Sequence, residues 1–136
     1  MDREFPFHVE LPVRYRDLDT LEHVNNAVYG TYLEQARIEY FEAVLGVAFD
    51  ELGMVLASIE MDFRRAIVLD DESVRIDCGV TDIGESSFQM GYRVYAAGDD
   101  APAATGETTL VVVDEAGTKP VPESWREAFR EFEPEL

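Results

Sequence analysis

Residues 25–46 read NNAVYGTYLEQARIEYFEAVLG, and this stretch decides the fold. Its apolar side chains recur every three or four residues, a spacing that places them along one side of an α-helix. Either asparagine at the start suits a helix N-cap, and Gly46 suits a C-terminal stop. Gly30 costs a helix roughly 1 kcal/mol relative to alanine, so we expect a close approach to a neighbour there. We predict one helix of about five turns.

Alternation of apolar and polar residues predicts five strands around this helix. The predicted strands cover 8–16, 55–64, 74–80, 88–94 and 103–113. Pro12 indicates that the first strand lies at a sheet edge, because proline has no N–H to donate to a neighbour. The last three strands have short links, which require antiparallel pairing. After Pro122, the spacing of Trp125, Phe129 and Phe132 predicts a short C-terminal helix that covers an apolar patch.

The predicted fold class is α+β, with one long helix packed on a five-stranded antiparallel sheet. We treat residues 1–136 as a single domain, because the chain has no repeat, linker or low-complexity tract. Cys78 is the one cysteine and falls on an inward strand position, so it is expected to be a small core residue. A lone cysteine fits a reducing compartment. No secretory signal or stretch of eighteen apolar residues is visible, so we expect a cytoplasmic protein without a membrane partner.

The charge balance is strongly acidic. Asp and Glu total 29 against 11 Lys and Arg, which gives a formal net charge of −18, and Lys119 is the only lysine. Such a surface repels phosphate backbones, so nucleic acid is not an expected partner. The composition resembles the acid-rich, lysine-poor surfaces of proteins from salt-loving microbes. Concentrated salt screens self-repulsion, since the Debye length is about 3 Å at 1 M. We hypothesise a halophilic source.

The stretch that carries chemistry is 16–29, RDLDTLEHVNNAVY, which joins the first strand to the long helix. A helix N-terminus presents unpaired N–H groups and about half a positive charge. It can polarise a carbonyl and stabilise an oxyanion. A nearby carboxylate stays ionised and can take a proton from water or attack a carbonyl. Thioesters suit this equipment, since their thiolate leaving group, with a pKa of about 8.5 by analogy with cysteine, needs little acid catalysis.

Several segments resemble the 4-hydroxybenzoyl-CoA thioesterase-like hotdog family. They are YRDLD at 15–19, HVNNAVY at 23–29, YLEQAR at 32–37, MDFRR at 61–65 and TKPVP at 118–122. The resemblance implies a hotdog fold, in which the sheet wraps the long helix. It also implies homodimers, often paired into homotetramers, with active sites between subunits.

By the same resemblance, Asp19 is the catalytic carboxylate and the backbone N–H of Asn26 binds the thioester oxygen. Many family members have a glycine where Glu22 stands here, and others have a histidine in place of Asn26. Asp19 has a structural alternative, because aspartate often closes a turn. We interpret Asp17 as structural, bonding loop amides, and give His23 a supporting role in catalysis.

The remaining candidates concern substrate binding, and each has a structural alternative. Asn25 could contact substrate or cap the helix, and Tyr29 could line the site or belong to the core. Arginines bind phosphates well, but in so acidic a chain they could equally satisfy carboxylates. Serines between the predicted strands 74–80 and 88–94 could line a pantetheine channel or simply form the turn there. The arginines are Arg64, Arg65 and Arg93, and the serines are Ser86 and Ser87.

We predict an acyl-CoA thioesterase that hydrolyses a CoA thioester to a carboxylic acid and free CoA, with Asp19 as general base or nucleophile. No cofactor is expected, and with His8 and His23 as the only histidines no metal site is expected. One alternative is a hotdog hydroxyacyl-thioester dehydratase or hydratase. Another is a non-catalytic acyl-CoA-binding module. The identity of the acyl group stays open.

Overall fold

The central element of the fold is helix α1 (Asn26–Leu45), seen here in a computed structural model that describes residues 3–47 and 53–136. Asn25 is its N-cap, with Oδ1 accepting the Ala27 N–H at 2.8 Å, and Gly46 ends it at φ 66°. The predicted helix and both of its ends are confirmed. The expectation for Gly30 is wrong within the described chain, because a Cβ added there would meet no atom within 4 Å.

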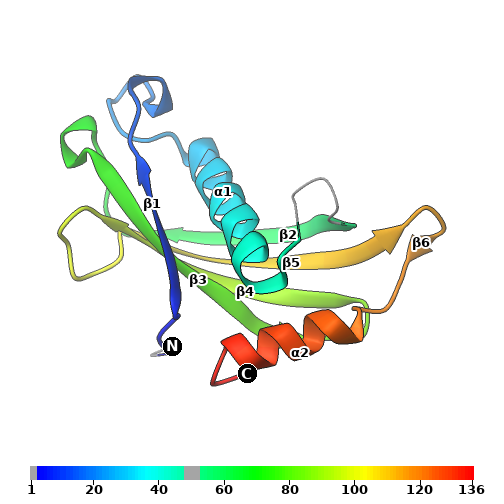
Figure 1. Cartoon of the computed structure of the whole chain (residues 1–136). Helices are drawn as coiled ribbons and strands as arrows, with labels where there is room; N and C mark the ends of the chain where they lie inside the picture. Colours follow the sequence, from blue (N-terminus) through cyan, green and yellow to red (C-terminus); the bar gives the residue numbers. More distant parts are fainter. Residues whose placement is uncertain (1–2, 48–52) are drawn as a thin grey trace.

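Five strands form one sheet that curls around α1 (Figure 1). Their order is β1-β3-β4-β5-β2, and all neighbours are antiparallel. This confirms the predicted antiparallel sheet and the edge position of the first strand. A two-residue strand, which the sequence did not predict, extends the end of β5. The strands are β1 (Phe7–Pro12), β2 (Met54–Phe63), β3 (Ser73–Ile83), β4 (Ser87–Ala96), β5 (Ala104–Asp114) and β6 (Gly117–Thr118).

The first strand is shorter than predicted. It ends at Pro12, and the chain then turns into a 3₁₀ helix, η1 (Tyr15–Asp17). The turn forms because Asp17 Oδ2 accepts the Arg14 N–H at 2.9 Å. Extension of the strand to residue 16 was therefore wrong, although Val13 still donates its N–H to Glu72 O.

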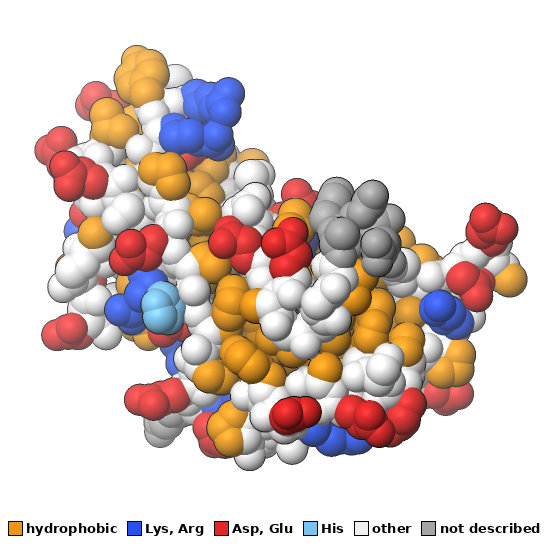
Figure 2. Space-filling view, viewed as in Figure 1, with side chains coloured by type: hydrophobic (Ala, Val, Ile, Leu, Met, Phe, Trp, Pro, Cys, Tyr) orange, Lys and Arg blue, Asp and Glu red, His pale blue; other side chains and the backbone are white. Residues whose placement is uncertain are grey.

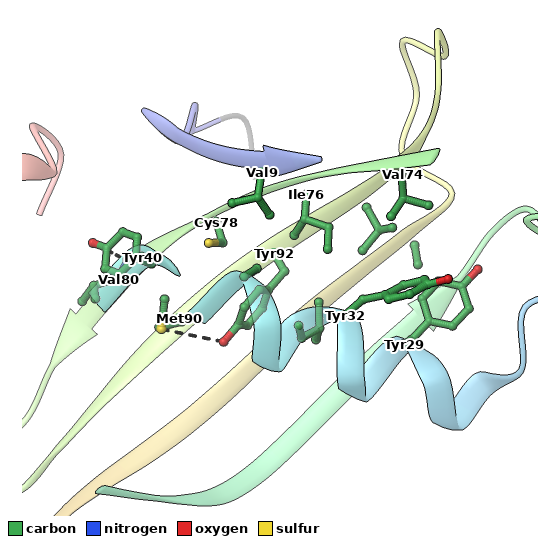
Figure 3. Packing of buried hydrophobic residues seen from close by; sticks show 14 of the residues in the cluster. Val9, Tyr29, Tyr32, Tyr40, Val74, Ile76, Cys78, Val80, Met90 and Tyr92 are labelled. Atoms are coloured by element: carbon green, nitrogen blue, oxygen red, sulfur yellow. Dashed lines mark hydrogen bonds between the residues drawn. The ribbon is translucent and has the colours of Figure 1, made fainter. Parts of the chain in front are cut away.

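The core lies between α1 and the inner face of the sheet (Figure 3). Cys78 is fully buried there, and burial raises the pKa of its thiol, so the thiol stays protonated as a core residue. The predicted C-terminal helix is α2 (Glu123–Phe132). Its Phe129 packs against Tyr40 and Phe88, with ring centroids 6.3 and 5.1 Å away. No helix within residues 3–47 and 53–136 has the length and apolar character needed to cross a membrane.

Candidate active site

The candidate site forms at one end of the sheet, where the β1–α1 connection folds back over the chain. The last residue of β1 pairs with Ser73, the first residue of β3. The connection then contacts the segment just before β3, since Val24 donates its N–H to Ile67 O and His23 forms a bridge with Val68. These contacts hold the Asp19 loop against the body of the protein.

Asp19 lies in a tight turn that its own side chain closes. Asp19 Oδ1 accepts the N–H of Leu21 at 2.9 Å and the N–H of His23 at 3.3 Å. The backbone completes the turn, because Asp19 N–H donates to His23 O at 2.8 Å. The second carboxylate oxygen forms no hydrogen bond within the described part of the chain. The turn-closing role is therefore real, and it leaves one oxygen of this half-buried side chain for chemistry.

Glu22 occupies an unusual backbone conformation within this turn. Its φ is 63°, in the left-handed region that favours glycine. A non-glycine residue there costs about 1–2 kcal/mol. The glycine that many relatives carry at this position therefore has a conformational explanation, and Glu22 adopts the same turn at a cost in stability.

The N-terminus of α1 is tied to the loop that carries Asp19. Asn25 donates its N–H to Asp17 O at 2.9 Å, while its side-chain oxygen caps the helix. The capping interpretation of Asn25 is thus confirmed, and a substrate contact stays a prediction. The N–H of Asn26 is the first of the helix, has no intrahelical acceptor by geometry, and meets none among the described residues. Asn26 is an exposed residue.

Asp17 is the buried carboxylate of the site, with 2% of its surface exposed. It accepts hydrogen bonds from the Tyr32 hydroxyl at 2.9 Å and from the Arg14 guanidinium at 3.1 Å, besides the Arg14 N–H. Burial alone would raise the pKa of Asp17, but the hydrogen bonds from Arg14 and Tyr32 outweigh it and lower the pKa. Asp17 is therefore an ionised structural residue that bonds a loop amide, as predicted. Its partner Tyr32 was missed, although a tyrosine in the second turn of the helix was visible in the sequence.

Tyr29 belongs to the core of this chain. Only 2% of its surface is exposed, and its ring contacts those of Tyr32 and Phe63, at 6.0 and 5.0 Å between centroids. Burial raises the pKa of Tyr29 to about 12, so the phenol is neutral. The structure favours the core interpretation of Tyr29 over substrate contact.

The two arginines that follow β2 have different surroundings. Arg65 binds both carboxylate oxygens of Asp71, at 3.1 and 3.0 Å, and also pairs with Asp99 at 3.3 Å. It satisfies carboxylates, which was the structural alternative to phosphate binding. Asp71 also accepts the Val68 N–H at 2.9 Å and so supports the segment next to His23. The position of Asp71 between two strands of the sequence did not reveal this role.

Arg64 lies away from this network. It lines a hollow of about 420 Å³ together with Arg93, Thr105 and Gln89. Arg93 donates to Arg3 O and lies over the Phe5 ring, so it is already engaged. Within one chain, Arg64 remains the better placed of these two for an incoming anion.

Ser86 and Ser87 do not join the site within one chain. They precede and begin β4, whose other end, at Ala96, lies beside the start of β3 and hence the Asp19 loop. Ten residues of strand separate the two ends by about 30 Å at 3.3 Å per residue. Within one subunit these serines therefore lie far from the Asp19 loop, in the turn before β4, and a pantetheine channel at them stays a prediction.

The His23 side chain is exposed, and its contacts to Asp19 use the backbone only. Among the residues that the structure describes, no three His, Cys, Asp or Glu side chains come together as a metal site.

Comparison with known proteins gives a consistent result. Residues 13–129 match the family described as the Thioesterase-like superfamily. A thioesterase from Thermus thermophilus, solved with coenzyme A and Zn, is 40% identical with a TM-score of 0.88, covering 98% of both chains. The PA5185 protein from Pseudomonas aeruginosa PAO1 shares the fold at 19% identity, with a TM-score of 0.85 over 96% of this chain and 93% of that one.

The uncharacterized protein YsmA from Bacillus subtilis strain 168 is 30% identical over 93% of this chain and 84% of its own length. The sheet that curls around one helix matches the hotdog fold of the Thermus thioesterase. The chain therefore belongs to the thioesterase-like superfamily and is a thioester hydrolase with a hotdog fold.

Proposed function

We propose that the protein hydrolyses an acyl-CoA to a carboxylic acid and free CoA, with Asp19 and the Asn26 N–H as its catalytic groups. The observation that carries the proposal is that the first N–H of α1 and the Asp19 carboxylate belong to one short segment. The Asn25 N–H donates to Asp17 O and so ties the start of the helix to the Asp19 loop. One oxygen of Asp19 closes the turn, and the other stays available for chemistry. The coenzyme A in the similar Thermus thioesterase supports a CoA thioester as substrate.

In this mechanism the thioester oxygen accepts the Asn26 N–H, and the positive end of α1 stabilises the oxyanion. Asp19 takes a proton from water as the water oxygen bonds to the acyl carbon. The C–S bond then breaks, and the CoA thiolate leaves with its electron pair and is protonated. In the nucleophilic variant, Asp19 itself bonds to the acyl carbon, thiolate leaves, and water cleaves the mixed anhydride.

A single turnover in ¹⁸O water identifies a mixed anhydride that opens at its aspartyl carbon. Attack of water on the acyl carbon labels the product acid. Attack on the aspartyl carbon of a mixed anhydride leaves the label in Asp19. Zinc is named with the Thermus structure, but no three His, Cys, Asp or Glu side chains come together in residues 3–47 and 53–136, and no step is assigned to a metal.

The decisive test is Asp19→Asn. Asparagine keeps an oxygen for the Leu21 N–H, so the turn persists while the carboxylate is lost. We expect kcat to fall about 10²–10⁴-fold, the usual contribution of a general base. Asp114→Asn is the matched control, because Asp114 Oδ1 accepts the Ala116 N–H in the same way at the end of β5. Near-normal turnover by Asp19→Asn would refute the assignment.

The same assays separate the two alternatives. Hydration of an enoyl-CoA without thiol release would support a dehydratase-type activity, and tight acyl-CoA binding without turnover would support a binding module. A panel of short, long and aromatic acyl-CoAs, assayed in concentrated KCl, identifies the preferred acyl group. We also propose that the protein is cytoplasmic and that it belongs to the 4-hydroxybenzoyl-CoA thioesterase-like subtype.

We further propose that the protein is a homodimer built on β2, with pairing of dimers into tetramers as in the family it resembles. β2 is an edge strand of the sheet, and Val55, Ile59 and Phe63 are 50, 43 and 46% exposed. Tyr29 in the first turns of α1 contacts Phe63, so a subunit seated on β2 would lie beside the candidate site.

The acidic surface supports the proposal of a halophilic source. Figure 2 shows acidic side chains spread around one face, with apolar side chains gathered toward its middle. A net charge of −18 on 136 residues disfavours compact and associated states through self-repulsion unless salt screens it.

A further inference from the structure

The long helix carries a buried arginine, Arg37, for which residues 3–47 and 53–136 supply no paired carboxylate. Arg37 is 6% exposed, and within the described part of the chain its Nη1 donates to the Tyr92 hydroxyl at 3.5 Å. The Tyr92 hydroxyl is also bonded to Thr108 Oγ1 at 2.7 Å. Glu34 and Arg37 are three residues apart on the helix, a spacing that would allow an ion pair, but that pair is not formed, and Arg37 makes no ion pair with any described residue. Buried charges are costly unless they are paired.

Arg37 faces a cavity of about 230 Å³ between α1 and β2. Glu34 lies on the rim of this cavity and is exposed. The other lining residues are apolar: Ile38, Phe41, Met54, Leu56 and Leu110. The Arg37 side chain thus lines this cavity, and Glu34 of the same helix lines it as well.

The surface next to this cavity is an uncovered apolar stripe. The backbone of α1 lies closest to β1 and β3, at the far side of the sheet from β2, and Tyr29 reaches across to contact Phe63 of β2. The β2 residues that pair with the inward side chains of β5 are all apolar, yet Leu56, Ile59 and Phe63 are 43–46% exposed. The stripe consists of Met54, Leu56, Ile59, Met61 and Phe63.

A second copy of this chain fits both the stripe and the unpaired edge. Addition of its β2 alongside β2 would continue the sheet, and its α1 would then cover the inner face of β2 beside the first α1. A two-fold axis makes every contact occur twice, so a residue pair on one helix meets the same pair in reverse. Glu34 and Arg37, three residues apart beside one cavity, have the opposite charges that such an arrangement requires.

We propose that Arg37 pairs with Glu34 of the partner subunit, and that this reciprocal ion pair specifies the dimer. Two chains of charge −18 repel each other, and two contacts between opposite charges at the interface would offset part of this repulsion. The partner's Glu34 supplies the carboxylate that Arg37 lacks in one chain. This inference rests on the proposed homodimer and is independent of thioester hydrolysis.

Charge reversal with complementation tests the pair directly. Glu34→Arg and Arg37→Glu each place like charges opposite one another, so each variant should sediment as a monomer at a concentration where wild type is dimeric. When the two variants are mixed, both contacts join opposite charges again, so a one-to-one heterodimer should form. An ion pair within one chain could not be restored by mixing. One variant carries a mass tag so that the heterodimer is identified.

A milder substitution at an exposed position is also tested, because Arg37→Glu changes a buried residue and could misfold. Glu34 is exposed, so Glu34→Gln leaves the fold intact, and its dimer dissociation constant should rise at least tenfold. Glu42→Gln is the control, because Glu42 is exposed on the side of α1 that faces β1. A mixture of reversed variants that stays monomeric, or a Glu34→Gln dimer as tight as wild type, would overturn the proposal. These measurements use sedimentation alone, so a failed thioesterase assay does not bear on them.

Discussion

The Tyr32 hydroxyl donates a 2.9 Å hydrogen bond to Asp17 Oδ2, and this contact joins the second turn of α1 to the loop that carries Asp19. The Asp17 carbonyl in turn accepts the Asn25 N–H at the start of the helix. One buried carboxylate residue therefore sets both the beginning of α1 and the position of the turn two residues later.

Removal of this hydroxyl in Tyr32→Phe should lower the free energy of unfolding by about 1.5–3 kcal/mol, the usual value for a hydrogen bond to a charged group. It should also lower kcat more than it changes KM, because the open Asn26 N–H and Asp19 lose their shared anchor. Tyr40→Phe is the control, since the Tyr40 hydroxyl donates to the buried Glu133 away from the site. An equal fall in kcat in both variants would contradict a local role for Tyr32.

The lowered pKa of Asp17 predicts a specific acid sensitivity. A carboxylate whose pKa is lower in the folded than in the unfolded state, here below the ordinary 3.8, stabilises the fold above the unfolded pKa. This contribution disappears as pH falls through the folded value. In Asp17→Asn the contribution is absent, so the stability difference from wild type should shrink below about pH 4.

Urea unfolding between pH 3 and 6 measures this difference. Burial raises the pKa of Glu133, so its contribution to stability has the opposite dependence on pH. Glu133 is present in both proteins, so its contribution cancels in the stability difference. A stability difference that stays constant across the range would show that Asp17 is not ionised in the folded state.

Local signals predicted the long helix, and long-range contacts explain where prediction failed. The Asn25 cap and the Gly46 stop act within a few residues, so both ends of α1 were readable. The end of β1 was not, because the turn after it depends on Asp17, which Tyr32 holds from fifteen residues away. The missing ion pair at Arg37 has a similar cause, since packing against Tyr92 draws the guanidinium inward.

In the candidate site, too, local contacts were predictable and long-range contacts were not. The Asp19 turn and the helix start lie within one short segment, so sequence alone could bring them together. The roles of Arg65 and Ser86 depended on which strands meet at which end of the sheet. Arg65 finds Asp99 from a distant turn, while Ser86 lies at the opposite end of β4. Residue type alone could not distinguish these cases.

The left-handed backbone at Glu22 predicts a stabilising substitution. Glu22→Gly should raise the free energy of unfolding by about 1 kcal/mol, because glycine adopts positive φ without the side-chain clash. Glu22→Ala removes the charge but keeps the Cβ, so it should give no such gain. Thermal unfolding of the three proteins measures the effect, and an equal gain in both variants would attribute it to charge instead of conformation.

The acidic surface predicts strong dependence on salt. The melting temperature should rise steeply between about 0.1 and 3 M KCl, because the Debye length shrinks from about 10 Å to a few ångströms and screens self-repulsion. Sucrose provides a control for exclusion effects that do not depend on charge. A melting temperature that is already maximal in low-salt buffer would count against a halophilic origin.

A buried ion pair joins Arg3, near the start of the described chain, to Glu133, which follows α2, and it predicts a non-additive effect on stability. Glu133 is fully buried and accepts from Arg3 at 2.9 Å and from the Tyr40 hydroxyl at 2.5 Å. Gly79 leaves the space, since a Cβ there would lie 2.6 Å from Glu133 Oε2. Glu133→Ala should cost about 3–5 kcal/mol, because it leaves the Arg3 charge buried and unpaired.

The double variant Arg3→Met, Glu133→Leu should cost much less than the sum of Arg3→Met and Glu133→Leu measured singly, since it leaves no lone charge behind. The Tyr40 hydroxyl loses its acceptor in the double variant, so some loss of stability should remain. Denaturant unfolding of wild type, both single variants and the double variant gives the coupling free energy. Additive losses would mean that Arg3 and Glu133 stabilise the protein independently, and that the pair does not hold the two ends of the chain together.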